Sequence, residues 1–360
     1  MVNRRALLQG GLTLGSLALV PTGLPVAEAA ATRAIAGEAM GSPVDPAALV
    51  PPELAAALEQ FRNSSPMPDV NAQNLAAMRA PGSDELPAKN SMPVWERRTI
   101  AGAQGAPQVA IYLINAGPAG SNKPAILHIH GGGYIFGRAA DAVGPLQKVA
   151  HELDCVIVSV DYRLAPETRF PGSLKDNYAA LRWLHESAQE LGVDRRRVAV
   201  MGESAGGGHA AMLAIAARDR GEFPLAAQIL IYPMLDDRTG SSREVPAHIG
   251  TFVWTRGSNR FGWSSLLGRP AGSARVPPGS VPARAATLAG LPPTFIGVGS
   301  LDLFVQEDTA YAQRLVEVGV ATELEIVPGG YHGFDIFAPE APLSKHFREA
   351  WMNALRRAFA

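Results

Sequence analysis

One short stretch of the sequence combines a serine with glycines at the spacing of a catalytic nucleophile. Gly202-Glu203-Ser204-Ala205-Gly206 follows the apolar run Val198–Met201 and precedes a segment of small residues. A serine on a tight turn between a strand and a helix is lifted clear of the backbone, and flanking glycines remove the side chains that would clash there. The N-terminus of the following helix favours developing negative charge. Ser204 is therefore a candidate nucleophile for acyl transfer.

A second glycine-rich stretch offers groups that can stabilise an oxyanion. His130-Gly131-Gly132-Gly133 stands at the end of the apolar run Ala125–His130. Backbone N–H groups aimed at a carbonyl oxygen stabilise the charge that develops there in acyl transfer. A phosphate-binding loop would instead need a Gly-Lys-Ser/Thr ending or a GxGxxG pattern, and this stretch has neither. We expect His130 itself to be a structural residue that orients the loop.

Two late apolar runs are followed by an acid and by a histidine. Asp302 comes after Thr294–Val298, and His332 comes after Thr322–Val327 in a glycine-flanked loop. The chain order Ser204, Asp302, His332 is that of an α/β-hydrolase triad. In that arrangement His332 takes the proton from the serine hydroxyl, while Asp302 fixes the imidazole tautomer and stabilises its cation.

The other histidines and acids have simpler interpretations. Packing or solvent explains several histidines, His128 on a predicted strand and His151, His185 and His209 on predicted helices. Glu307 and Asp308 fall in the predicted helix Gln306–Val318 and are expected to serve its first turn. Asp335 follows His332 too closely in sequence to brace it.

The elements that position these residues alternate along the chain from about residue 95. Apolar runs predict buried strands at Val109–Ile114, Ala125–His130, Val156–Val160, Val198–Met201, Gln228–Tyr232, Thr294–Val298 and Thr322–Val327. Apolar residues recur at helical spacing from Leu174 to Leu184, which predicts a helix with Gly192 as its C-cap. The fold class is therefore α/β, a mostly parallel sheet with helices on both faces.

Two segments depart from this alternation and are interpreted as a cap. Residues 30–94 are rich in Ala, Pro, Ser and Asn, with helix-like stretches at Pro52–Phe61 and near Asn71–Met78. Residues 235–290 interrupt the catalytic domain, 95–360, at the carboxyl edge of the sheet, where ligands bind in such folds. The aromatic residues of this insertion either line an apolar pocket or pack against the sheet: Phe252, Trp254, Phe261 and Trp263.

The N-terminus has the pattern of an export signal. Arg4 and Arg5 precede 22 uncharged residues, Ala6 to Ala27, and small residues for cleavage follow at Ala27-Glu28-Ala29. The paired arginines resemble a twin-arginine signal. A retained membrane anchor is the alternative, because this stretch is long enough to span a bilayer, although its glycines and prolines weaken such a helix. We expect residues 1–29 to be removed and the mature chain to be periplasmic or secreted in a bacterium.

Composition excludes several classes of protein. The chain has 360 residues, of which 47% are hydrophobic and 18% charged, so it can bury a large core. A net charge of -1 without a long basic run argues against a nucleic-acid partner. The single cysteine, Cys155, excludes an internal disulfide and is expected to be a buried core thiol. No metal-ligand cluster or dinucleotide fingerprint occurs in the sequence, so no cofactor is implied.

Five features together resemble the hormone-sensitive-lipase-like esterases, bacterial family IV of the α/β-hydrolases. They are HGGG at 130–133, DYRLAPE at 161–167, GESAGG at 202–207, Asp302, and HGF at 332–334. The likeness covers about residues 95–358. It implies Ser204 as nucleophile, His332 as base and Asp302 as acid. It also implies an oxyanion hole formed by the N–H groups of Gly132, Gly133 and Ala205.

The resemblance assigns a structural role to DYRLAPE and leaves two departures. Asp161, Arg163 and Glu167 would pin loops beneath the site and perform no chemistry. The family usually has Asp before the nucleophile, whereas this chain has Glu203, as do cholinesterase-like carboxylesterases. After Asp302 the family often has a further charged pair, where this chain has Val305-Gln306.

The sequence therefore predicts a carboxylic ester hydrolase that acts on short to medium acyl esters of small molecules. A hydrolase of amides, lactones or carbamates would use the same residues, and a non-catalytic binding relative would typically lack one of them. We expect no stable membrane insertion after signal cleavage. Exposed edge strands in such sheets can pair between subunits, so a homodimer is one of the expected oligomeric states.

Overall fold

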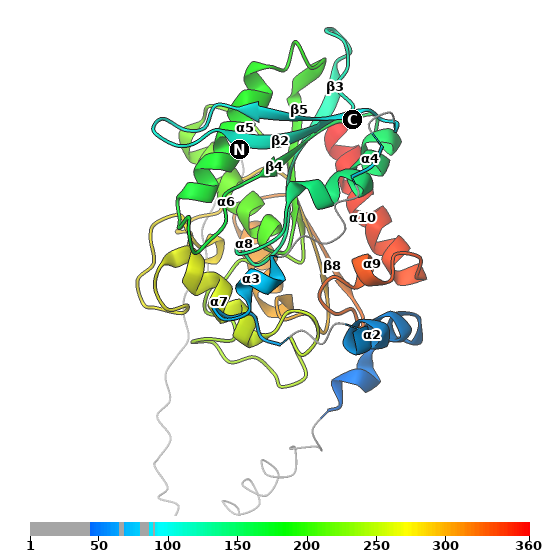
Figure 1. The fold of residues 1–360 in the computed structure, drawn as a ribbon, viewed down its shortest axis with the longest axis vertical. Coiled ribbons are helices and arrows are strands. Elements are labelled where there is room, and N and C mark those ends of the chain that lie inside the picture. Colours follow the sequence, from blue (N-terminus) through cyan, green and yellow to red (C-terminus); the bar gives the residue numbers. More distant parts are fainter. Residues whose placement is uncertain (1–43, 65–67, 80–85, 89–90) are drawn as a thin grey trace, which may run out of the picture. The chain divides into compact units, whose positions relative to one another are not determined.

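A sheet of eight strands forms the centre of the part of the chain that the computed structural model describes, residues 44–64, 68–79, 86–88 and 91–360 (Figure 1). In spatial order the strands are β1 (Trp95–Ile100), β2 (Val109–Ile114), β4 (Val156–Asp161), β3 (Lys123–Ile129), β5 (Val193–Glu203), β6 (Ala227–Ile231), β7 (Thr294–Gly299) and β8 (Thr322–Val327). β2 is antiparallel to both of its neighbours, and the remaining pairs are parallel. The predicted α/β class is confirmed. The predicted export signal lies outside the described residues.

The seven predicted strands are all present, and β1 is the strand that the sequence reasoning missed. Its sequence, Trp-Glu-Arg-Arg-Thr-Ile, has only its two apolar ends buried. β1 lies at an edge of the sheet, where it pairs with β2 alone. Charged side chains on an edge strand discourage pairing with other chains, so the polarity that hid this strand is a consequence of its position.

Helices cover both faces of the sheet. They are α2 (Pro52–Ser64), α3 (Leu75–Met78), α4 (Val143–Glu152), α5 (Gly172–Glu186), α6 (Ala205–Arg220), α7 (Arg256–Leu267), α8 (Val305–Glu317), α9 (Phe334–Phe337) and α10 (Pro342–Phe359). Short 3₁₀ turns lie at Pro46–Leu49, Ala139–Ala142 and Pro282–Arg284. The helices α5, α6 and α8 bury their apolar residues on one face, and α2, α4, α9 and α10 do so on the other.

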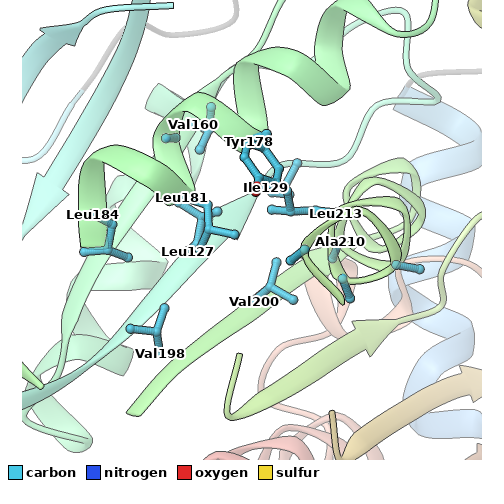
Figure 2. Packing of buried hydrophobic residues seen from close by; sticks show 14 of the residues in the cluster. Leu127, Ile129, Val160, Tyr178, Leu181, Leu184, Val198, Val200, Ala210 and Leu213 are labelled. Atoms are coloured by element: carbon cyan, nitrogen blue, oxygen red, sulfur yellow. The ribbon is translucent and has the colours of Figure 1, made fainter. Parts of the chain in front are cut away.

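Alternate residues of each strand face these two layers. Leu127 and Val200 contribute to the core beneath α5 and α6, together with Leu181 and Leu213 from those helices (Figure 2). Their neighbour Ile126 belongs to the core on the opposite face. Because both of their faces are buried, β3, β4, β6 and β7 are largely apolar, which is the pattern that predicted them, whereas β8 at the edge is only partly buried.

The predicted C-cap of the helix from Leu174 to Leu184 is wrong. α5 ends at Glu186, with Ser187 as its C-cap. Gly192 has a φ of 67° and lies in the turn that leads into β5, where a Cβ would be 2.5 Å from the carbonyl oxygen of Pro118. The glycine signal was therefore real, but it belongs to the strand entry.

The segment 235–290 carries α7 and long loops, and it packs against the N-terminal residues. Val70 donates its N–H to the Ser258 hydroxyl at 3.0 Å, and Val70 and Leu75 share an apolar cluster with Trp254 and Trp263. Trp254 and Trp263 thus pack among the N-terminal segment, the loop residue Tyr134 and helices α6 and α7, and their cluster contains no strand residue.

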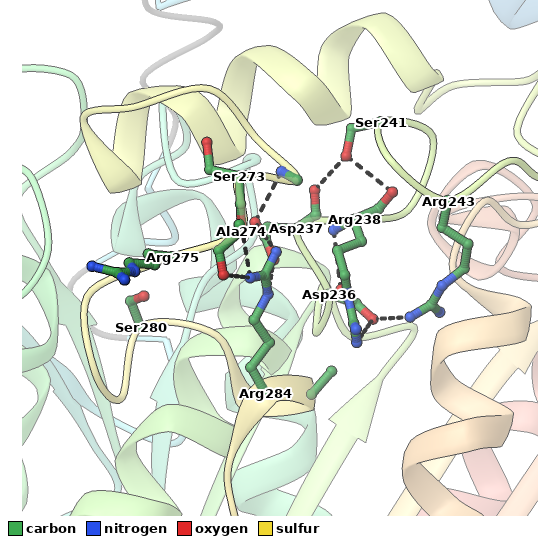
Figure 3. Close-up of polar contacts among 12 residues, drawn as sticks. Asp236, Asp237, Arg238, Ser241, Arg243, Ser273, Ala274, Arg275, Ser280 and Arg284 are labelled. Atoms are coloured by element: carbon green, nitrogen blue, oxygen red, sulfur yellow. Dashed lines mark hydrogen bonds and ion pairs between the residues drawn. The ribbon is translucent and has the colours of Figure 1, made fainter.

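A network of buried charges fastens the two ends of this segment together (Figure 3). Asp236 accepts hydrogen bonds from Arg238 at 2.8 Å and from Arg243. Asp237 accepts one from Arg284 and one from the N–H of Gly272, both at 2.9 Å. Buried carboxylates are tolerated only when paired and hydrogen-bonded in this way.

The residues of DYRLAPE pin loops, as the resemblance implied. Arg163 donates to the buried carboxylate of Asp176 from Nε at 2.8 Å and from a terminal nitrogen at 2.7 Å. Glu167 pairs with Arg79 at 2.8 Å. The Asp161 carboxylate accepts the N–H of Ala139 at 3.1 Å.

Replacing Arg163 with alanine is expected to lower the free energy of unfolding by about 3 kcal/mol, because the Asp176 carboxylate would stay buried without its partner. Chemical denaturation measures the change. Arg196→Ala is the matched control, since the Arg196 side chain is 90% exposed, and it should change stability by less than about 0.5 kcal/mol. Equal stability of R163A and wild type would contradict the assignment.

Candidate active site

Ser204 lies on a strained turn between β5 and α6. Its φ is 57° and its ψ is -121°. A positive φ is unfavourable for a residue other than glycine, at a cost of about 1–3 kcal/mol, and such strain gathers at functional sites. The Ser204 N–H donates to the carbonyl oxygen of Ile231 at 2.8 Å, which ties the turn to the end of β6.

The glycines on either side of Ser204 are required by close backbone contacts. A Cβ on Gly202 would lie 2.4 Å from the carbonyl group of Gly206. A Cβ on Gly206 would lie 1.9 Å from the carbonyl oxygen of Ile129, at the end of β3. Only glycine lets α6 start this close to the sheet.

The three residues of the predicted triad form one hydrogen-bonded row. His332 Nε2 lies 2.9 Å from Ser204 Oγ, and His332 Nδ1 lies 2.7 Å from Asp302 Oδ2. Asp302 is 1% exposed, and its other oxygen accepts the N–H of Phe304 at 3.0 Å. With Nδ1–H donated to the carboxylate, Nε2 is left to accept the serine hydroxyl proton.

The HGGG loop runs beside this row. A Cβ on Gly131 would lie 3.0 Å from the Glu203 carbonyl oxygen and 3.4 Å from Ser204 Cβ. Gly132 and Gly133 have φ values of 117° and 58°, a region that glycine adopts readily. The third predicted oxyanion donor, Ala205, is the first residue of α6, so its N–H has no acceptor within the helix. Gly131 therefore places the glycine loop against Ser204, and Ala205 follows the serine directly in the chain.

His130 orients the loop, as the sequence suggested. Its Nδ1 lies 2.8 Å from the carbonyl oxygen of Gly131. Its ring stacks on Tyr162 with centroids 4.3 Å apart, and the Tyr162 hydroxyl donates to the His130 carbonyl oxygen at 3.0 Å. Burial lowers the pKa of His130, which favours the neutral form.

Glu203, the departure from the family pattern, has a partner that the sequence reasoning missed. His128 Nε2 lies 3.0 Å from Glu203 Oε2, and His128 Nδ1 lies 2.8 Å from the Ser159 hydroxyl. The three residues come from the neighbouring strands β5, β3 and β4. The signal was the presence of a histidine in an otherwise apolar strand, which needs a polar neighbour when buried.

Tyr232 links the Asp335 carboxylate to the His332 ring. The Tyr232 hydroxyl donates to Asp335 Oδ1 at 3.0 Å, and the Tyr232 ring meets the His332 ring edge-on, with centroids 4.9 Å apart. The pKa of Asp335 is raised to about 6, chiefly by burial and also by the charge of Glu203, while the Tyr232 hydrogen bond opposes this rise.

Glu307 and Asp308 are in the first turn of α8, as predicted, but a role confined to that turn is wrong for Glu307. Glu307 Oε1 accepts the N–H groups of Leu235 and Asp236 at 2.6 and 3.0 Å, so it holds the start of the 235–290 segment. Both carboxyl groups are buried, which raises the pKa of each. Sequence patterns cannot show this contact, because it joins α8 to a loop about 70 residues away.

Across residues 44–360, apart from the gaps at 65–67, 80–85 and 89–90, no group of three or more His, Cys, Asp or Glu is arranged to hold a metal ion. None of the helices described in the same ranges is both long and apolar enough to span a bilayer. Cys155 is buried, as predicted, and burial raises its pKa to about 12.

Comparison with known proteins gives a consistent result. Residues 126–336 match a family model described as the alpha/beta hydrolase fold. The carboxylesterase NlhH of Mycobacterium tuberculosis is 35% identical over 278 residues, which are 73% of this chain and 82% of NlhH. Esterase LipI of the same species is 32% identical over 267 residues, 71% of this chain and 80% of LipI. The resemblance found in the sequence is confirmed.

Solved structures agree with the sequence relatives. A bacterial heroin esterase covers 88% of this chain and all of its own, with 35% identity and a TM-score of 0.74. A hyperthermophilic esterase from the archaeon Pyrobaculum calidifontis covers 85% of this chain and 92% of its own, with 29% identity and a TM-score of 0.65.

Asp335→Asn is expected to make stability less dependent on pH. The pKa of Asp335 is raised from 3.8 to about 6 on folding, so ionisation between pH 4 and 6 costs the wild type about 3 kcal/mol of unfolding free energy. Asparagine does not titrate, and the stability of D335N relative to wild type should therefore rise over this pH range and stay level above it. Denaturant unfolding at pH 4.5 and 7.5 measures the difference.

Tyr232→Phe is the companion variant for the same titration. It removes the hydrogen bond that lowers the folded-state pKa of Asp335, so the pH-dependent loss of stability should continue to a higher pH before it levels off. A D335N difference that is the same at both pH values would show that Asp335 does not titrate in this range.

Proposed function

We propose, from the premise that the chain belongs to the hormone-sensitive-lipase-like family of α/β-hydrolase esterases and is a carboxylesterase, that it hydrolyses short to medium acyl esters of small molecules through Ser204, His332 and Asp302. The observation that carries the proposal is the continuous row from Ser204 Oγ through the His332 ring to Asp302, beside the glycine loop. The names of the relatives support the ester as the bond that is cleaved.

The reaction proceeds in two halves. Ser204 Oγ attacks the ester carbonyl carbon as His332 Nε2 takes its proton, and the carbonyl oxygen becomes an oxyanion held by the N–H groups of Gly132, Gly133 and Ala205. Nε2–H then protonates the leaving alcohol, and an acyl-serine remains. Water attacks the acyl-serine with His332 again as base, which releases the acid and restores Ser204.

The charges around the triad fit this cycle. The imidazolium that forms in each half is paired with the buried Asp302 carboxylate, whose second oxygen is held by the Phe304 N–H. Because Asp302 is fixed at both oxygens, it holds the His332 ring in the orientation that both halves need. Amides, lactones and carbamates would react through the same groups, so only their direct assay separates these substrates.

Ser204→Ala and His332→Ala are each expected to lower kcat on 4-nitrophenyl acetate by about 10⁴-fold or more, with little change in KM, because both act only in the chemical step. Asp302→Asn should lower kcat by about 10⁴-fold, since an amide selects the wrong imidazole tautomer. Steady-state kinetics on the three purified variants measures both effects.

Glu340→Gln serves as the matched control, because Glu340 is exposed and pairs with Lys345 on the surface. It should keep the wild-type rate. A fluorophosphonate probe should phosphonylate Ser204 in wild type, with loss of HF and a gain of mass equal to the probe less HF, and should leave S204A unmodified. Full activity of folded S204A would refute the proposed nucleophile, and activity on amides but not on esters would replace the proposed substrate class.

We further propose that residues 1–29 direct export through the twin-arginine pathway and are removed afterwards. The paired arginines and the small residues before position 30 support this. Replacing Arg4 and Arg5 together with lysine should retain the protein inside the producing cell, while the exported wild type should have the mass of residues 30–360. An exported protein of full-length mass would show a retained anchor instead.

A homodimer stays a prediction, which the mass of the native protein in solution tests.

A further inference from the structure

The described residues leave little open space over Ser204. Ser204 and His332 are each only 7% exposed, and Trp254 above them is 3% exposed. A Cβ on Gly133 would lie 2.2 Å from Cη2 of Trp254, so the indole lies directly on the glycine loop. The indole is also 6.5 Å from the His332 ring, measured between centroids. Trp254 therefore borders both the oxyanion loop and the base.

The backbone before Trp254 is strained in a way that fixes the indole at this place. Val253 has a φ of 62°, and the N–H of Trp254 donates to the carbonyl oxygen of Phe252 at 2.7 Å. A bond between residues two apart around a positive φ is the rarer and strained form of γ-turn. For a β-branched residue such a φ is a genuine outlier, and outliers of this kind concentrate at ligand-contacting segments.

Side-chain hydrogen bonds fix the orientation of the ring as well. Trp254 Nε1–H donates to Asn259 Oδ1 at 3.2 Å, and Asn259 Nδ2 donates to the carbonyl oxygen of Thr239 at 2.8 Å. Asn259 is fully buried on α7. The indole is thus held by α7 and by the start of the 235–290 segment, and it faces the triad as a rigid wall.

The stereochemistry of acyl transfer identifies the part of the substrate that meets this wall. The carbonyl oxygen must point to Gly132 and Gly133, and the leaving oxygen must face His332 Nε2, which protonates it. The acyl group takes the remaining direction. A side chain that borders both Gly133 and His332 is therefore next to the alcohol portion of the ester.

We propose that Trp254 determines specificity by limiting the size of the alcohol portion of the ester. This inference rests on the proposed function, because it uses the oxyanion loop and His332 in their catalytic roles. It restricts the substrates to esters whose alcohol is small near the ester oxygen, and it places no such limit on the acyl chain.

Two series of esters test the proposal on the full-length enzyme. The alcohol series compares diphenylmethyl acetate with benzyl acetate, and the acyl series compares benzyl octanoate with benzyl acetate. Trp254→Ala should raise the kcat/KM ratio of the first pair by about 10-fold or more, since pocket contacts of this kind discriminate by about 10- to 200-fold. The ratio of the second pair should change by less than about 2-fold.

Trp254→Phe and Trp183→Leu complete the design. W254F keeps an aromatic ring but is smaller, so its alcohol ratio should lie between those of wild type and W254A, and it decides the question if W254A fails to fold. Trp183 lies on α5, where it packs against the core beside Arg98. W183L should therefore leave both ratios at the wild-type values.

Two results would overturn the proposal. One is a kcat/KM ratio for the alcohol series that stays at the wild-type value in W254A or W254F, although that variant reacts with the fluorophosphonate probe as fully as wild type. The other is a shift in the acyl ratio in place of the alcohol ratio. Failure of the proposed function would look different, because wild type would then hydrolyse none of the esters and Ser204 would not react with the probe.

Discussion

The structure depends on the close approach of β3, β5 and α6 beneath Ser204. The carbonyl oxygen of Ile129 occupies the place that a Cβ on residue 206 would take, and the Gly206 carbonyl group does the same for residue 202. This contact lets the chain reverse between strand and helix within one residue, at the cost of a positive φ at Ser204. The hydroxyl is thereby presented at the carboxyl edge of the sheet, where the loops that follow β7 and β8 deliver Asp302 and His332.

Several buried polar groups around the triad each have a specific partner. Asp302 holds His332, Glu203 meets His128, and Tyr232 links Asp335 to the His332 ring. In a low-dielectric interior each such group is costly when unpaired and rigid when paired. The same physics fastens the loops farther out, where Arg163, Arg284 and Glu307 hold segments that no regular hydrogen-bond ladder connects. Rigidity at the site is therefore built from side-chain contacts as well as from the sheet.

The 235–290 segment is the least regular part of the described structure. It carries few backbone ladders and is held at its ends by the Asp236 and Asp237 network. Between those ends, the turn at Val253 places Trp254 on the glycine loop. Ser204, Asp302 and His332 follow the ends of β5, β7 and β8, while Trp254 of this segment lies on the glycine loop beside them. In the proposed function, chemistry and selectivity are therefore carried by different elements.

The sequence by itself determined the sheet class, seven of the strands and the residues that meet at the site, because apolar runs and glycine-flanked polar residues are local signals. Those signals predicted Ser204, Asp302 and His332 as neighbours although 128 residues separate the first from the last. Strand β1, the end of α5, the Glu203–His128 pair and the position of Trp254 were decided only by the tertiary structure. Each depends on the position of a distant part of the chain, which sets the edge of the sheet, places a carbonyl oxygen or supplies a buried hydrogen bond. The spacing of residues within one segment does not encode such contacts.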